Sequence, residues 1–127
     1  TGAGLIGELP EEMPVIEWLN RVKQEFQVPM LRYSKGNREK VKRIALCGGS
    51  GAFLTRAAMQ QGADVFLSAD FKYHDFFDGE DRLMLVDMGH YESEQFTISL
   101  IYEQIREKFP TFAVRKTNLN TNPINYI

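Results

Sequence analysis

Short apolar runs alternate with helix-like stretches along this chain. Three runs are apolar at every position, as in strands that are covered on both faces: 44–47, 65–67 and 83–86. Each is followed by a stretch of helical character: about 52–61, a short turn at 74–77, and a long helix at about 91–109. This βαβαβα order predicts an α/β fold, a three-layer sandwich with a mainly parallel central sheet and right-handed crossovers.

Weaker patterns flank this core. Apolar residues at helical spacing after Pro14 predict a first helix over 14–27. Residues 28–33 predict an edge strand, because Pro29 has no N–H for a central ladder, and the polar stretch 35–42 predicts a solvated loop. A final strand and an extended tail are expected from three late apolar positions: Phe112, Val114 and Ile124. We expect one α/β domain over residues 1–127.

Composition narrows the class of protein. The 127 residues carry a net charge of −2, which gives no basic field for nucleic acid, so nucleic-acid binding is disfavoured. A single cysteine cannot form an internal disulfide, and no apolar run approaches membrane-spanning length. We therefore expect a soluble, cytoplasmic protein. The chain starts at Thr1 without an initiator methionine, which fits either methionine removal or a piece of a longer protein.

Three polar clusters follow the three apolar runs: 48–51, 70–74 and 87–94. The loops that leave parallel strands emerge at one edge of the sheet, so these clusters are expected to converge. A carboxylate-bearing, Lys-bearing and His-bearing edge can hold a metal ion together with a small anionic or nucleotide-like substrate. This convergence is stronger evidence for a site than any of the motifs alone.

His90 and Glu94 are the candidate metal ligands. They lie one helical turn apart, and Glu94 is expected at the mouth of a buried apolar stripe formed by Ile98, Ile101 and Ile105. An unpaired carboxylate there is costly, and a metal ion shared with His90 is the simplest compensation. The pair is only half a site, because zinc needs four ligands and harder cations need more. The alternative is an ordinary first helical turn whose Glu answers the helix dipole.

The remaining candidates also have two interpretations. Gly49, Ser50 and Gly51 form either an anion-binding loop or, as the missing third glycine of a dinucleotide motif favours, a tight strand-to-helix turn. Asp87 either caps the following helix or orients His90 from behind. Three more residues are either substrate-facing or ordinary surface capping and ion-pairing groups: Asp70, Lys72 and His74.

Segments 47–51, 62–74 and 87–94, in this order and spacing, resemble the NIF-three-like dinuclear metal-centre family, the GTP cyclohydrolase I type 2 homologues. The resemblance extends from residues 4–9 to residues 122–127. It implies a two-metal site in which His90 and Glu94 match the C-terminal ligand pair. The other ligands of the family, a His-His-Pro element, a further His and an Asp, belong to an N-terminal half that this sequence lacks, so the chain resembles the C-terminal portion of such a protein.

One departure is Ser68-Ala69-Asp70, where the family more often has Thr-Gly-Asp, and this puts a shared backbone geometry in doubt. The resemblance also implies ring-shaped hexamers with inward-facing metal sites.

The expected function is a metal-dependent hydrolase in which two divalent ions, zinc, manganese, iron or magnesium, lower the pKa of a bridging water. His90 and Glu94 are expected to be ligands, with Asp87 behind them and Lys72 and His74 facing the substrate. This chain alone is expected to bind metal weakly and to be inactive. The alternative is a non-catalytic regulatory or scaffold protein whose metal site stabilises a ring-shaped homo-oligomer.

Overall fold

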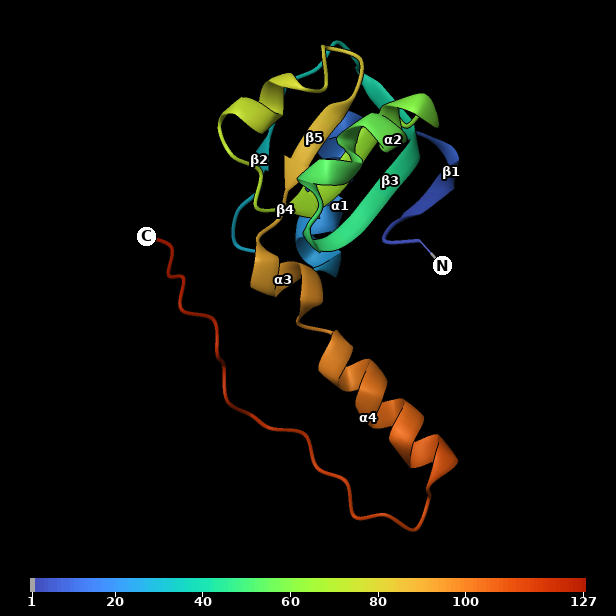
Figure 1. Ribbon diagram of the computed structural model, residues 1–127, viewed down its shortest axis with the longest axis vertical. Helices are drawn as coiled ribbons and strands as arrows, with labels where there is room; N and C mark the ends of the chain where they lie inside the picture. The colour runs from blue at the N-terminus through green and yellow to red at the C-terminus, as the bar shows by residue number, and fades with distance from the viewer. Residues whose placement is uncertain (1) are drawn as a thin grey trace. The chain divides into compact units, whose positions relative to one another are not determined.

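The structure is a computed structural model that describes residues 2–127. Its centre is a five-stranded sheet of order β1-β3-β4-β5-β2, with strands β1 (Leu5–Pro14), β2 (Arg32–Tyr33), β3 (Lys40–Ser50), β4 (Val65–Ala69) and β5 (Met84–Asp87) (Figure 1). Strands β3, β4 and β5 are parallel, whereas β1 and β2 are antiparallel edges. The predicted mainly parallel sheet is confirmed.

Helices cover both faces of the sheet, as Figure 1 shows for α1 (Val15–Glu25) and α2 (Thr55–Gln60). Strand β4 alternates between the two sides. Val65 and Leu67 pack in the cluster that contains the α1 residue Trp18, and Phe66 packs in the cluster that contains the α2 residue Ala58. This alternation buries β4 on both faces and produces the predicted three layers. The remaining helical segments are η1 (Ala52–Leu54), η2 (His74–Phe77), α3 (His90–Glu94) and α4 (Thr97–Lys108).

Contacts divide the chain into two units, of which the first ends at Ser93 and the second runs from Glu94 to Ile127. The second unit consists of α4 and a tail that forms no strand. The prediction that the whole chain forms one domain stays a prediction. Within residues 2–127, none of the helices is long and apolar enough to cross a membrane.

The predicted long helix at 91–109 is wrong, because α3 ends at Glu94 and α4 begins at Thr97. The Ser93 hydroxyl donates to the carbonyl of His90 at 2.8 Å, a back-bond of the kind that bends helices. The predicted burial of the Ile98, Ile101 and Ile105 stripe is also wrong, since α4 has no buried residue. A lone helix with an irregular tail offers no second layer within its own unit to cover that stripe.

The ends of the sheet also differ from the prediction. Strand β1 was not predicted, because LIGELPEEMP has few apolar residues, of which Leu5 and Ile6 are exposed at an edge. The loop predicted at 35–42 ends earlier, because β3 already begins at Lys40. No strand forms over 112–124 in the described tail, where Phe112 and Ile124 are exposed. Apolar residues in this tail have no neighbouring strand to pair with in their own unit.

Candidate metal centre

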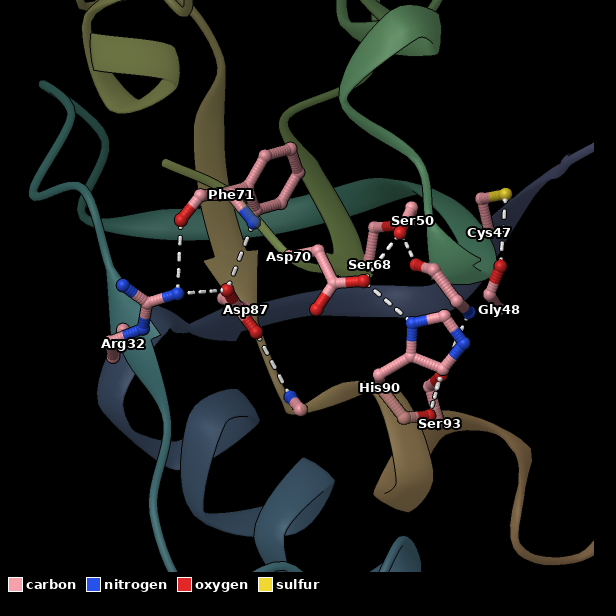
Figure 2. A network of polar contacts seen from close by, with 12 residues as sticks. Arg32, Cys47, Gly48, Ser50, Ser68, Asp70, Phe71, Asp87, His90 and Ser93 are labelled. Carbon is pink, nitrogen blue, oxygen red and sulfur yellow. Dashed lines mark hydrogen bonds and ion pairs between the residues drawn. The ribbon is translucent and has the colours of Figure 1, made fainter. Parts of the chain in front are cut away.

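The ends of β3, β4 and β5 bring Ser50, Asp70 and His90 together, as the convergence of the loops predicted (Figure 2). Asp70 Oδ2 lies 2.6 Å from His90 Nδ1 and also accepts a hydrogen bond from the Ser50 hydroxyl. Both the Asp70 and the His90 side chains are about half exposed, at 48% and 49%. The imidazole is thus held by a carboxylate at Nδ1 in a position that solvent can reach.

Two further properties of Asp70 concern its charge and its backbone. The hydrogen bond from His90, and then the one from Ser50, hold the pKa of its carboxyl below the usual value. Its backbone is left-handed, with φ at 59°, a conformation that Asp tolerates better than most residues. Backbone outliers of this kind gather at functional sites, where the surrounding structure holds them in place.

Asp87 supplies that surrounding structure. Its side chain is 5% exposed, and its Oδ2 accepts the N–H of Phe71 at 3.1 Å and a charged bond from Arg32. Its Oδ1 accepts the N–H of Gly89 at 2.9 Å. One buried carboxylate therefore fixes the residue after Asp70 and the residue before His90. Asp87 thus binds the backbone next to Asp70 and next to His90. The carboxylate that contacts the imidazole itself is that of Asp70.

Arg32 is a site residue that sequence reasoning missed. Strand β2 pairs with β5 so that Arg32 lies opposite Asp87, at the edge where β4 and β5 end. Its Nη2 also donates to the carbonyl of Phe71 at 3.0 Å. The only available signal was the predicted edge strand at 28–33, and the register of a two-residue strand cannot be read from its residues.

The glycine-rich loop after β3 has structural reasons for its glycines. Gly49 adopts φ 65°, and its N–H donates to the Ser93 hydroxyl at 2.8 Å. A Cβ at Gly51 would stand 2.1 Å from Ser68 Oγ, so only glycine fits there. Because the Ser50 hydroxyl is bonded to Asp70, two polar groups of this loop are already used within the chain. These contacts fit a tight turn, and anion binding by the loop stays a prediction.

The structure does not connect Lys72 or His74 to the polar network around His90 within residues 2–127. The Lys72 N–H donates to Asp75 Oδ2 at 2.7 Å, which forms the turn before η2. The His74 ring is exposed and lies edge-on to Tyr73, with 5.2 Å between ring centroids. Both residues follow the carboxyl end of β4, and their role in facing a substrate stays a prediction.

Glu94 is the last residue of α3 and is exposed, while His90 is the first residue of the same helix. This placement keeps the predicted spacing of one helical turn. In the part of the chain that the structure describes, no three His, Cys, Asp or Glu side chains are grouped to hold a metal ion. The assignment of His90 and Glu94 as metal ligands stays a prediction.

Comparisons with known proteins show which family and which proteins this chain is similar to. A model of the family described as Duf34/NIF3 (NGG1p interacting factor 3) matches residues 1–123. A Staphylococcus aureus (strain MSSA476) protein named GTP cyclohydrolase 1 type 2 homolog is 31% identical over 130 residues, covering 99% of this chain and 36% of its own length. A Staphylococcus epidermidis (strain ATCC 12228) protein with the same name is 30% identical over 131 residues.

Two solved structures superpose closely on this chain. The crystal structure of Staphylococcus aureus protein SA1388 superposes with a TM-score of 0.83 at 30% identity, covering 98% of this chain and 42% of that one. The Bacillus cereus protein related to NIF3 gives a TM-score of 0.84 at 30% identity, covering 99% of this chain and 36% of that one. This chain spans about a third of the length of the curated relatives that it matches, 36% of the first of them.

Proposed function

The chain belongs to the Duf34/NIF3 family, and from that membership we propose that it supplies His90 and Glu94 to a dinuclear metal centre of a hydrolase. The chain contributes two ligands, and side chains outside this sequence complete the centre. The relatives named GTP cyclohydrolase 1 type 2 homolog suggest a nucleotide-like substrate. No contact in the described residues selects guanine.

The observation that carries this proposal is the carboxylate of Asp70 on His90 Nδ1, at 2.6 Å. Metal-ligating histidines commonly donate one ring N–H to a carboxylate, which fixes the tautomer and the ring orientation and raises the basicity of the other nitrogen. With Nδ1 given to Asp70, Nε2 is the nitrogen through which His90 would ligate a metal. The residues present therefore fit the group that the family implies.

Glu94 would add an oxygen ligand one helical turn after His90. A nitrogen and an oxygen donor suit zinc, manganese or iron, and magnesium is the least fitting of the four because it prefers oxygen ligands. When bound, two such ions would lower the pKa of a bridging water to the neutral range. Lys72 and His74, at the carboxyl end of β4, are proposed to face the substrate.

The test uses the longer protein that contains this chain. Glu94→Ala should remove bound metal and GTP turnover while leaving assembly intact, as measured by metal analysis, release of formate and of phosphate, and light scattering. Glu103→Ala, which removes the same charge from an exposed position in α4, is the matched control and should change nothing. Hydrolysis that persists in both Glu94→Ala and His90→Ala would refute the proposed ligand pair.

A second candidate function is a non-catalytic metal-binding scaffold of a ring-shaped homo-oligomer, a hexamer in the family resemblance. The observation that favours it is the apolar surface of α4, on which Ile98, Leu100 and Ile101 are all exposed. Exposed apolar patches often mark interfaces. The same experiment separates the two functions, because a scaffold would show no turnover in the wild type and would lose assembly together with its metal.

A further inference from the structure

Arg32 is fixed at the edge of the sheet by hydrogen bonds and an ion pair that use only one arm of its guanidinium. Nη2 donates to the carbonyl of Phe71 at 3.0 Å and forms the ion pair with the buried carboxylate of Asp87. The guanidinium also stands over the ring of Phe76, with 5.5 Å to the centroid. A guanidinium held at three points has already lost most of its rotational freedom, so a ligand that binds it has little ordering left to impose.

The rest of this side chain is accessible. The Arg32 side chain is 57% exposed although its partner Asp87 is only 5% exposed. Within residues 2–127, its hydrogen bonds and its ion pair all use Nη2, and Figure 2 shows Nη1 and Nε on the side turned away from Asp87. The carbonyl that holds Nη2 belongs to the residue after Asp70, and Asp87 also binds the residue before His90. Asp87 therefore anchors both Arg32 and the residue before His90, and Figure 2 shows Arg32 and His90 on opposite sides of Asp87.

We propose that Arg32 binds an oxyanion, a phosphate or a carboxylate of the substrate, at the edge of the sheet where β4 and β5 end. This deepens the proposed function by naming the chemical group that the substrate presents. Guanidinium donors are well suited to phosphate and carboxylate, and charge-assisted bonds to them are the stronger kind. Because Asp87 already neutralises part of the positive charge and solvent reaches the site, affinity for a free anion is on the order of 1 mM.

Arg56 is the control residue for anion binding at Arg32. It lies on α2, is exposed, and forms no hydrogen bond or ion pair in the described part of the chain. It carries the same charge as Arg32 without the anchoring contacts. Any anion binding that depends only on surface charge should therefore involve both arginines, whereas binding to a prepared site should involve Arg32 alone.

The experiment follows the side-chain Nε–H signals of the arginines by NMR in this chain without metal, while sodium phosphate replaces sodium chloride at constant ionic strength. The Arg32→Lys and Arg56→Lys spectra assign the two signals. We expect the Arg32 signal to shift and saturate near millimolar phosphate, and the Arg56 signal to stay in place. An Arg32 signal that does not move, or an Arg56 signal that moves in parallel, would overturn the proposal.

Two further measurements keep the result interpretable. Acetate titrated in the same way identifies the preferred oxyanion, since either anion binding at Arg32 supports the proposal and failure of both overturns it. Arg32→Lys keeps the charge beside Asp87, and phosphate binding to it is followed through the backbone N–H signal of Phe71, which Arg32 contacts. Unchanged Trp18 fluorescence with at least about tenfold weaker phosphate binding shows that the guanidinium geometry matters. Because no metal is present, failure of the ligand pair at His90 and Glu94 would leave this result unchanged, and the two proposals fail separately.

Discussion

Replacing Asp87 tests whether one buried carboxylate holds the two loops of the site together. Asp87→Ala would leave the N–H groups of Phe71 and Gly89 without their acceptor and would remove the partner of Arg32. A buried donor left unsatisfied costs about 1–3 kcal/mol, and breaking a buried ion pair by removing one partner costs about 3–5 kcal/mol. Because Arg32 is half exposed and water can hydrate it, we expect a total loss of about 3–4 kcal/mol.

Asp87→Asn should cost less, about 1–3 kcal/mol, because the amide keeps one acceptor oxygen but loses the charge. Stability is measured by urea unfolding followed through the fluorescence of Trp18, which is the only tryptophan and is buried under the sheet. Glu8→Ala is the matched control, since it breaks the exposed pair with Arg43 and should cost less than about 1 kcal/mol.

The relative losses of unfolding free energy in these variants test the role of the buried network. An Asp87→Ala protein that is no less stable than Glu8→Ala would show that the buried network does not support the fold. A destabilised Asp87→Asn protein whose His90 ring signals are unchanged by NMR would show that the network does not position the imidazole.

Three further predictions concern Gly51, Asp70 and the binding of metal ions. Gly51→Ala should destabilise the protein by about 1–3 kcal/mol in urea unfolding, because its Cβ would stand 2.1 Å from Ser68 Oγ, and an unchanged midpoint would refute this packing. Asp70→Gly should keep the free energy of unfolding within about 1 kcal/mol, since glycine adopts positive φ freely, yet it should shift the ring nitrogen signals of His90 in NMR spectra, because Nδ1 loses its partner. In calorimetric titration this chain should bind zinc or manganese more weakly than about 1 µM, and sub-micromolar binding that His90→Ala abolishes would mean that the chain holds a complete site.

The parallel core could be predicted because burial on both faces leaves an unmistakable record in the sequence. Every residue of β4 and β5 is buried, and both strands fall on the apolar runs that were identified. The edge strands have no continuous apolar run that would identify them. Strand β1 is exposed along most of its length, and its pairing with β3 depends on backbone hydrogen bonds that any residue except proline can donate.

The site, like the fold, could be predicted only in part. Convergence of the three loops followed from topology, and it brought Ser50, Asp70 and His90 together as expected. The assignment of individual bonds did not follow, because Asp70 and Asp87 are both carboxylates at the ends of neighbouring strands. Which of them meets the imidazole depends on the backbone direction at each strand end, and the left-handed φ of Asp70 has no signature in residue type beyond the tolerance of Asp for it.

That left-handed residue also explains why the departure from the family pattern at position 69 is harmless to the backbone. Ala69 is the last residue of β4 and is completely buried, and it is not among the residues of positive φ, so no glycine is required there. The turn of the chain falls one residue later, at Asp70, where the carboxylate swings toward Ser50 and His90. A methyl group at position 69 is therefore buried in a strand conformation that any residue can adopt, and the left-handed turn falls to Asp70. The residue that must tolerate strain is the same one that orients the imidazole, and the buried Asp87 holds it there through Phe71.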